Sequence, residues 1–218
     1  MKSLAQLFLS DQDREKIIQT VKEVELKTAG EIVPMVVSKS HSYPMADVLG
    51  AVAVALPIAL ILTHFWGGWL WIGHQNMWLF LGIFTGCFIV FHQSCKRIFW
   101  LKRVFISQRE IQEEVEEAAI TCFFREGLYR TRYGTGVLIF ISVFERRVWV
   151  LGDYGINSKV SKDQWDKIIH IITDGIQHNN QAEAICRSIR QAGLLLAAHF
   201  PIQPDDCNEL ENLIVKEE

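Results

Sequence analysis

The longest pattern in the chain is an apolar stretch in which residues 48–95 contain no Asp, Glu, Lys or Arg. It holds two apolar runs of 18 residues each, Val48–Phe65 and Met77–Ser94. Eighteen helical residues extend about 27 Å, close to the roughly 30 Å hydrocarbon core of a bilayer. The connecting residues, 64–76, are rich in Gly and Trp, and Trp favours the membrane–water interface. The pattern predicts a transmembrane helical hairpin with a short outer loop. The alternative is a buried helix pair in a soluble protein, which the lack of a polar face disfavours.

The charges that flank the two apolar runs predict their orientation. The loop between the runs carries no Lys or Arg, whereas basic residues follow the second run closely: Lys96, Arg97, Lys102, Arg103 and Arg109. Cytoplasmic flanks of membrane helices carry the excess of Lys and Arg. We therefore expect a two-pass protein that contacts the lipid bilayer, with both termini and the main domain in the cytoplasm.

Outside the apolar stretch, helical and strand-like segments alternate. Helical spacing of apolar residues follows Ser10, and capping boxes open helices at Ser107 and Ser161. Three segments are strand-like: Glu31–Ser38, Val137–Val143 and Val148–Leu151. In the first of these, Pro34 predicts an edge strand or a bulge, because proline donates no ladder hydrogen bond.

The three strand-like segments lie on both sides of the apolar stretch. Since a lone strand is unstable in water, we expect them to share one sheet. The predicted fold class is α/β, with a small central sheet flanked by helices and an inserted two-helix transmembrane hairpin. Residues 1–47 and 96–201 then form one domain, residues 48–95 the hairpin, and residues 202–218 an acidic tail.

The loop around Asp153 is the best candidate for chemistry. It follows a strand and lies between Gly152 and Gly155, and a carboxylate there offers oxygen ligands to a divalent cation. Glu31, Asn157 and Asp163 are expected to contribute if the fold brings them close. The alternative is that Asp153 caps a turn, with Gly155 supplying an unusual backbone angle.

Two arginines form a second candidate site. Arg146 and Arg147 lie in the predicted turn between the last two strands, where they are placed to bind phosphate or lipid headgroups. The alternative is that both are solvated turn residues. The net charge is −3, without a long block of like charge, which argues against a nucleic-acid partner. The chain has no phosphate-binding G-x-x-x-x-G-K and no zinc-binding H-E-x-x-H.

Four short segments resemble the TPM domain family: Thr28–Val33, Gly136–Ser142, Glu145–Trp149 and Gly152–Ile156. The resemblance covers residues 11–200, with the hairpin as an insertion, and is nearest to a bacterial group of membrane proteins. It implies a central sheet flanked by helices and a location in the bacterial inner membrane. Plant thylakoid members of the family act in photosystem II repair and have acid phosphatase activity. Some members bind calcium or other divalent metals, and a nematode relative is an ion-channel accessory protein.

Two functions follow as hypotheses. The first is a cytoplasmic-face interaction or accessory module that binds a membrane-protein partner and aids its assembly or turnover. The second is a metal-dependent, acid-phosphatase-like hydrolase that uses the Asp153 loop. The residues alone do not decide whether the protein is an enzyme.

Overall fold

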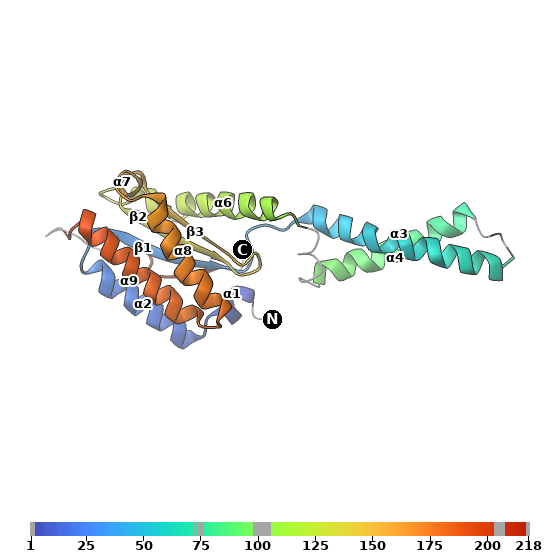
Figure 1. The fold of residues 1–218 in the computed structure, drawn as a ribbon, viewed down its shortest axis with the longest axis horizontal. Coiled ribbons are helices and arrows are strands. Elements are labelled where there is room, and N and C mark those ends of the chain that lie inside the picture. The colour runs from blue at the N-terminus through green and yellow to red at the C-terminus, as the bar shows by residue number, and fades with distance from the viewer. Residues whose placement is uncertain (1–2, 72, 74–75, 98–105, 203–207, 217–218) are drawn as a thin grey trace. The chain divides into compact units, whose positions relative to one another are not determined.

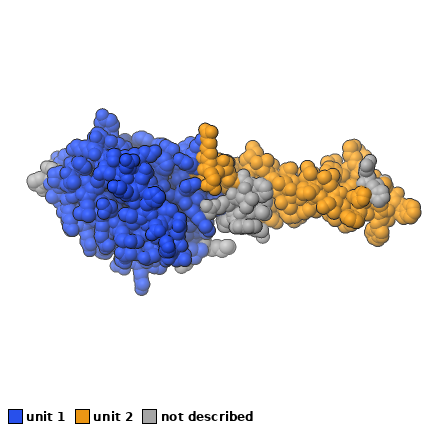
Figure 2. All heavy atoms as spheres, viewed as in Figure 1, with its two compact units in different colours: residues 1–41, 112–218 blue, residues 42–111 orange. Residues whose placement is uncertain are grey.

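The chain folds into two compact units, shown in Figure 2: residues 1–41 with 112–218, and residues 42–111. The computed structural model describes residues 3–71, 73, 76–97, 106–202 and 208–216. The predicted basic flank at Lys102 and Arg103 lies outside the described residues. Each unit is described by itself below, with the element labels of Figure 1.

The first unit is built around one four-stranded sheet in the order β3-β2-β1-β4. Its strands are β1 (Glu31–Val37), β2 (Gly136–Ser142), β3 (Arg147–Gly152) and β4 (Ile214–Lys216). The strand β1 is parallel to β2, with Glu31 opposite Gly136, and β2 and β3 form an antiparallel hairpin. The three predicted strands therefore share one sheet, as expected. Since β1 and β2 are parallel, the chain between them makes a long crossover, and the two apolar runs lie within it.

The sequence pattern does not predict the fourth strand, β4. It lies in residues 202–218, which the sequence predicts as an acidic tail, and it pairs in parallel with Met35–Val37 of β1. Three residues are too few to produce a periodic signal. The strand β1 is therefore internal in the sheet order and not an edge, which corrects one expectation from Pro34.

Pro34 is tolerated because β4 is short. Ser38 donates its N–H to Lys216 of β4, so by alternation the N–H positions of residues 32, 34 and 36 face the same side. The pairing with β4 begins only at Met35, so the missing N–H of Pro34 breaks no ladder bond. The open side of β1 next to Pro34 is where the candidate site described below is found.

Helices cover both faces of the sheet. Their bounds in this unit are α1 (Leu4–Phe8), α2 (Asp11–Glu25), α6 (Gln108–Arg125), a 3₁₀ turn (Leu128–Arg130), α7 (Tyr154–Asn157), α8 (Lys162–Gln177) and α9 (Gln181–His199). Ser161 forms the predicted capping box that opens α8, and Ser10, predicted to begin a helix, also forms a capping box at the start of α2. Each capping box satisfies helix N–H groups that would otherwise lack partners.

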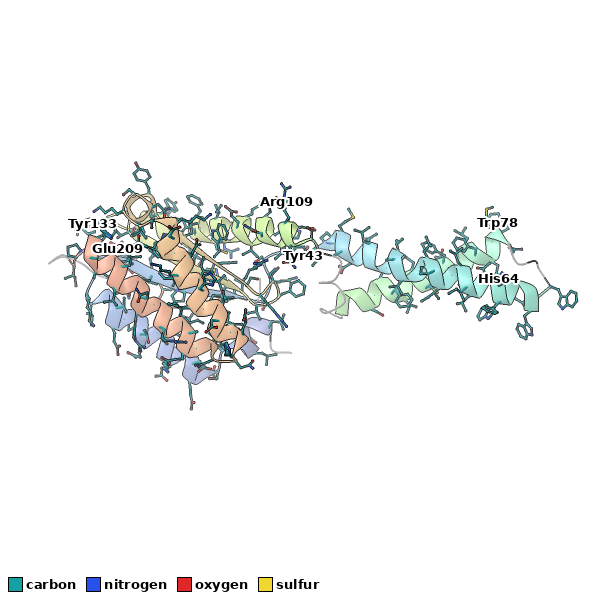
Figure 3. All side chains as sticks on the ribbon, in the orientation of Figure 1. Tyr43, His64, Trp78, Arg109, Tyr133 and Glu209 are labelled. Carbon is teal, nitrogen blue, oxygen red and sulfur yellow. The ribbon has the colours of Figure 1, made fainter. Side chains whose placement is uncertain are left out.

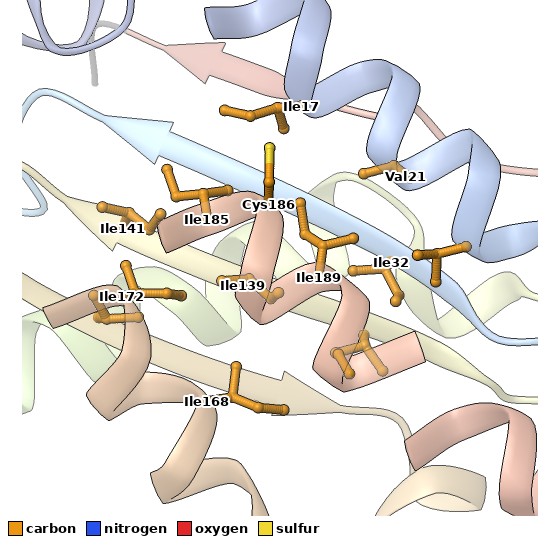
Figure 4. Packing of buried hydrophobic residues seen from close by; sticks show 14 of the residues in the cluster. Ile17, Val21, Ile32, Ile139, Ile141, Ile168, Ile172, Ile185, Cys186 and Ile189 are labelled. Carbon is orange, nitrogen blue, oxygen red and sulfur yellow. The ribbon is translucent and has the colours of Figure 1, made fainter. Parts of the chain in front are cut away.

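The main core lies between the sheet and the helices α2, α8 and α9. Figure 4 shows Ile17 of α2, Ile139 of β2, Ile168 of α8 and Ile189 of α9 packed together. The helix α6 lies on the opposite face, where Phe140 lines a pocket with α6 residues. Both faces of β2 are buried, which explains its uninterrupted apolar sequence.

The second unit contains the two apolar helices. They are α3 (Pro44–Trp69) and α4 (Met77–Arg97), which pack against each other. Both are long and apolar enough to cross a membrane, with mean hydropathies of 2.3 and 1.5 over their best windows. Small residues of α3 recur about every four positions and are buried: Ala51, Ala55, Ala59, Thr63 and Gly67. Small residues at this spacing allow close helix approach within lipid.

Candidate functional site

The Asp153 loop is organised by its own side chains. Asp153 is the N-cap of α7, and its Oδ1 accepts a hydrogen bond from the Tyr154 N–H at 2.6 Å. Asn157 donates its side-chain N–H to the Gly152 carbonyl, also at 2.6 Å. Gly155 does not adopt a left-handed angle. It is required because a Cβ there would lie 2.6 Å from the Gly134 carbonyl oxygen. Asp153 and Asn157 therefore both hold the local main chain in shape.

The predicted cation ligands occupy two places. Glu31 begins β1 and Asp153 follows β3, so β2 separates them by two strand spacings, about 9–10 Å between main chains. Their amides donate to Thr135 and Gly136 respectively, on the two sides of β2. Asp163 lies in the first turn of α8. Within the described ranges, no three His, Cys, Asp or Glu side chains are grouped to hold a metal ion.

The two arginines lie at the far end of the β2–β3 hairpin from Asp153. Arg146 occupies the turn with a positive φ of 52°, and Arg147 begins β3. Both are exposed. The seven residues of β2 separate the two ends by about 20 Å. An anion bound at these arginines would therefore not share a site with the Asp153 loop.

A pair of carboxyls, Glu25 and Glu31, forms the most developed polar cluster on the open side of β1. The Glu25 Oε1 accepts the Ile32 N–H at 3.0 Å, and its Oε2 accepts the Asn212 amide at 2.9 Å. The Glu25 carboxyl also hydrogen-bonds that of Glu31. Glu31 is 6% exposed and accepts the main-chain N–H of Glu209 at 3.3 Å. The pair thus joins the end of α2, the start of β1 and the C-terminal segment.

The C-terminal segment extends this cluster. Glu209 accepts the Arg132 N–H with its carboxylate at 3.0 Å, while its own N–H is donated to Glu31. Figure 3 shows Glu209 beside Tyr133 at the end of the sheet where β1 and β2 begin. The segment that leads into β4 is therefore held by side-chain contacts as well as by strand pairing.

Burial shifts the pKa of Glu25 within this pair. Desolvation raises the pKa of Glu25 to about 8, the neighbouring Glu31 carboxyl raises it further, and hydrogen bonds from Ile32 and Asn212 oppose the rise. At neutral pH the Glu25 carboxyl is then mostly protonated. An adjoining pocket of about 390 Å³ is lined by both carboxyls, Lys22 and Asn208, among others. This arrangement can hold or release a proton, and its oxygen atoms are of the kind that bind hard cations.

Sequence reasoning found Glu31 but not its partner. Glu25 was not singled out in the sequence; it ends α2 and lies six positions before Glu31. The available signal was a carboxylate at a helix end, followed by a short turn and a second carboxylate at the start of a strand. Only the turn at residues 26–30 shows that the two side chains meet.

The described residues define a class of protein: an α/β domain with two long apolar helices inserted in the crossover between β1 and β2. Residues 102–194 match the model of the TPM domain. This match confirms the resemblance to the TPM domain family.

A solved structure supports the fold over nearly the whole chain. The NMR structure of the BA42 protein from the psychrophilic bacterium Bizionia argentinensis aligns with 96% of this chain and 95% of its own. The TM-score is 0.59 and the sequence identity is 22%. At this identity the similarity concerns the fold alone. No curated protein matches the chain significantly.

Proposed function

We propose that this protein is a membrane-anchored TPM-domain module that works at the cytoplasmic face of the bacterial inner membrane. In this proposal it binds a membrane-protein partner and aids that partner's assembly or turnover. The observation that carries the proposal is the insertion of α3 and α4 inside the crossover of the α/β domain. A hairpin in that place is joined to the domain at both ends of the hairpin. This double connection keeps the domain near membrane-embedded partners.

Detergent extraction and affinity capture test this function. The tagged full-length protein is expected to retain the same membrane proteins in replicate captures. The matched control carries the same tag on a chain that keeps residues 48–95 and their flanks but has an unrelated cytoplasmic domain in place of the α/β domain. If the two baits capture the same proteins, or if neither retains any protein reproducibly, the proposal fails.

The proposed orientation predicts the accessibility of the loop between α3 and α4. Trp69 is 79% exposed at the end of α3, and no Lys or Arg lies between the helices. With native cysteines replaced by serine, Trp69→Cys is expected to react with an impermeant maleimide on intact cells. Glu15→Cys, on an exposed face of α2, is the control and is expected to react only after lysis. The reverse pattern would place the α/β domain outside the cell.

A second candidate function is a metal-dependent, acid-phosphatase-like hydrolase. The observation that favours it is the Glu25–Glu31 pair beside a pocket, with Asp153 on the other side of β2. The purified protein would hydrolyse a phosphomonoester with added Ca²⁺, Mg²⁺ or Mn²⁺, and Glu31→Gln would abolish the rate. Equal hydrolysis rates for the wild type and Glu31→Gln would exclude the Glu25–Glu31 pair as the catalytic site. The variant Asp153→Ala tests the predicted loop in the same assay.

A further inference from the structure

The strand β3 presents an open edge. It pairs with β2 on one side, and no described residue pairs with its other side. Asp153 donates its N–H to the Gly136 carbonyl, which makes these two residues a hydrogen-bonded antiparallel pair. Such pairs alternate along a ladder, so the main-chain N–H and C=O groups of Val148 and Val150 point away from β2.

This edge lacks the features that usually protect a strand. Natural edge strands carry charges, prolines or bulges that prevent further pairing. The residues Val148–Leu151 are all apolar, include no proline and keep an unbroken register with β2. The only charged residue of β3 is Arg147, at its beginning. The main-chain N–H and C=O groups on this edge are therefore available to pair with another strand.

A groove of about 580 Å³ runs beside the open edge of β3. Its walls come from α6, with Glu116 and Ile120, and from α8, with Asp166 and Ile169. These helices cover opposite faces of the sheet, and both contribute residues to the groove beside β3. A strand added to β3 would thus be covered on both faces, which favours apolar side chains in it.

The groove also contains a buried donor. Trp165 lines it and is 6% exposed. Its indole N–H has no hydrogen-bond partner among the described residues. A buried donor without a partner destabilises the structure that contains it.

The charges at the rim indicate the composition of the occupant. Glu116 and Asp166 contribute two carboxylates, and Lys162 contributes one ammonium group. The complementary segment carries a Lys or Arg next to its apolar residues. Membrane proteins have Lys and Arg next to apolar segments on their cytoplasmic side. A second copy of this chain fits less well, because antiparallel pairing of two β3 strands would bring Glu116 of each copy onto one face of the joined sheet.

We propose that this groove binds an extended, apolar and basic segment of a membrane-protein partner by strand addition to β3. The nature of the partner rests on the function proposed above, whereas the strand addition rests on the groove alone. Main-chain hydrogen bonds to Val148 and Val150 supply affinity, and the apolar walls together with the acidic rim select the sequence.

A labelled peptide tests the strand addition. The full-length protein in detergent is titrated into fluorescein-KVTVIVR, and saturable binding is followed by fluorescence anisotropy. Val150→Pro removes an N–H that points away from β2, so it is expected to weaken binding at least tenfold. Val150→Thr keeps the main chain and is the matched control, expected to bind like the wild type. Glu116→Lys should weaken binding about fivefold, whereas Glu15→Lys, the same charge change on α2, should not.

Two N-methylated forms of the peptide keep the test valid even if Val150→Pro fails to fold. One form is methylated at the main-chain nitrogens of its odd positions, and the other at those of its even positions. Since alternate N–H groups of a strand point to the same side, only one form loses the N–H groups that face β3. Strand addition requires that one form binds at least tenfold more weakly than the other. Equal binding of both forms, or no binding of the unmodified peptide, overturns the proposal.

Two further outcomes separate the occupant from the function. A dimer in detergent that Val150→Pro dissociates, measured by light scattering, would replace the partner segment with a second copy and so overturn the proposed occupant. If wild type and Val150→Pro capture the same membrane partners, the interaction function stands and this groove is not its site. If the peptide binds as expected but no partner is captured, the strand addition stands and the proposed function fails.

Discussion

Replacing both Leu56 and Leu60 of α3 with arginine is expected to release most of the protein from the membrane. Both side chains lie near the middle of α3 and are about half exposed, at 43% and 55%. A leucine-to-arginine change at the centre of a membrane helix costs about 3–4 kcal/mol of insertion free energy. The pair therefore costs roughly 6–8 kcal/mol. The helix α4 is the less apolar of the two, with a mean hydropathy of 1.5.

Alkaline extraction of membrane fractions measures this effect. The wild-type protein is expected to stay in the pellet, and the double arginine variant to move to the supernatant or to be degraded. The double alanine variant at the same positions is the control, because it removes the same leucines without adding charge. If the double arginine protein stayed in the pellet after extraction, α3 would not span the bilayer, and a peripheral or buried helix pair would take its place.

The replacement Glu25→Gln is expected to flatten the pH dependence of stability. Burial raises the pKa of Glu25 to about 8 in the folded protein from an ordinary value of 4.5. The native state therefore keeps a proton that the unfolded state releases between these values. The stabilisation is complete below about pH 4.5 and is lost as the pH rises through about 8. For one proton the slope approaches 1.4 kcal/mol per pH unit.

Thermal unfolding of the detergent-solubilised protein from pH 5 to pH 8.5 measures this slope. The difference in unfolding temperature between Glu25→Gln and the wild type should grow with pH in favour of the variant, because the amide cannot ionise. It also keeps an oxygen for the Ile32 N–H. Glu23→Gln, on an exposed part of α2, is the control and should follow the wild type. Parallel curves for Glu25→Gln and the wild type would contradict the raised pKa of Glu25.

The same ionisation is expected to loosen the C-terminal segment before the domain unfolds. Asn212 donates to Glu25, and Glu209 donates to Glu31, so two like charges on this pair would repel within the cluster that holds both residues. Hydrogen exchange in the peptide covering residues 208–216 should therefore rise toward pH 8.5 faster than in β2, after correction for intrinsic rates. Glu25→Gln should suppress that difference.

The sequence was sufficient to predict those structural features that depend only on residues close together in the chain. The lengths of α3 and α4 follow from local hydropathy, and both predicted runs lie inside the observed helices. The helix start at Ser10 and the capping box at Ser161 depend on residues at most three positions apart, so these features are also local. The apolar run of β2 indicated a strand buried on both faces, because burial on both faces leaves no place for alternating polar residues.

Only the tertiary structure decided which distant side chains meet. Glu31 was expected to join Asp153 and Asn157 only if the fold brings them close, and it pairs instead with Glu25, because β2 lies between β1 and β3. The order of strands depends on contacts between residues far apart in the sequence, which no local pattern encodes. The same holds for the groove beside β3, whose walls come from α6 and α8. The sequence by itself determined three of the four strands and the apolar helix pair, and the packing of the elements decided where the protein presents carboxyls and an open strand.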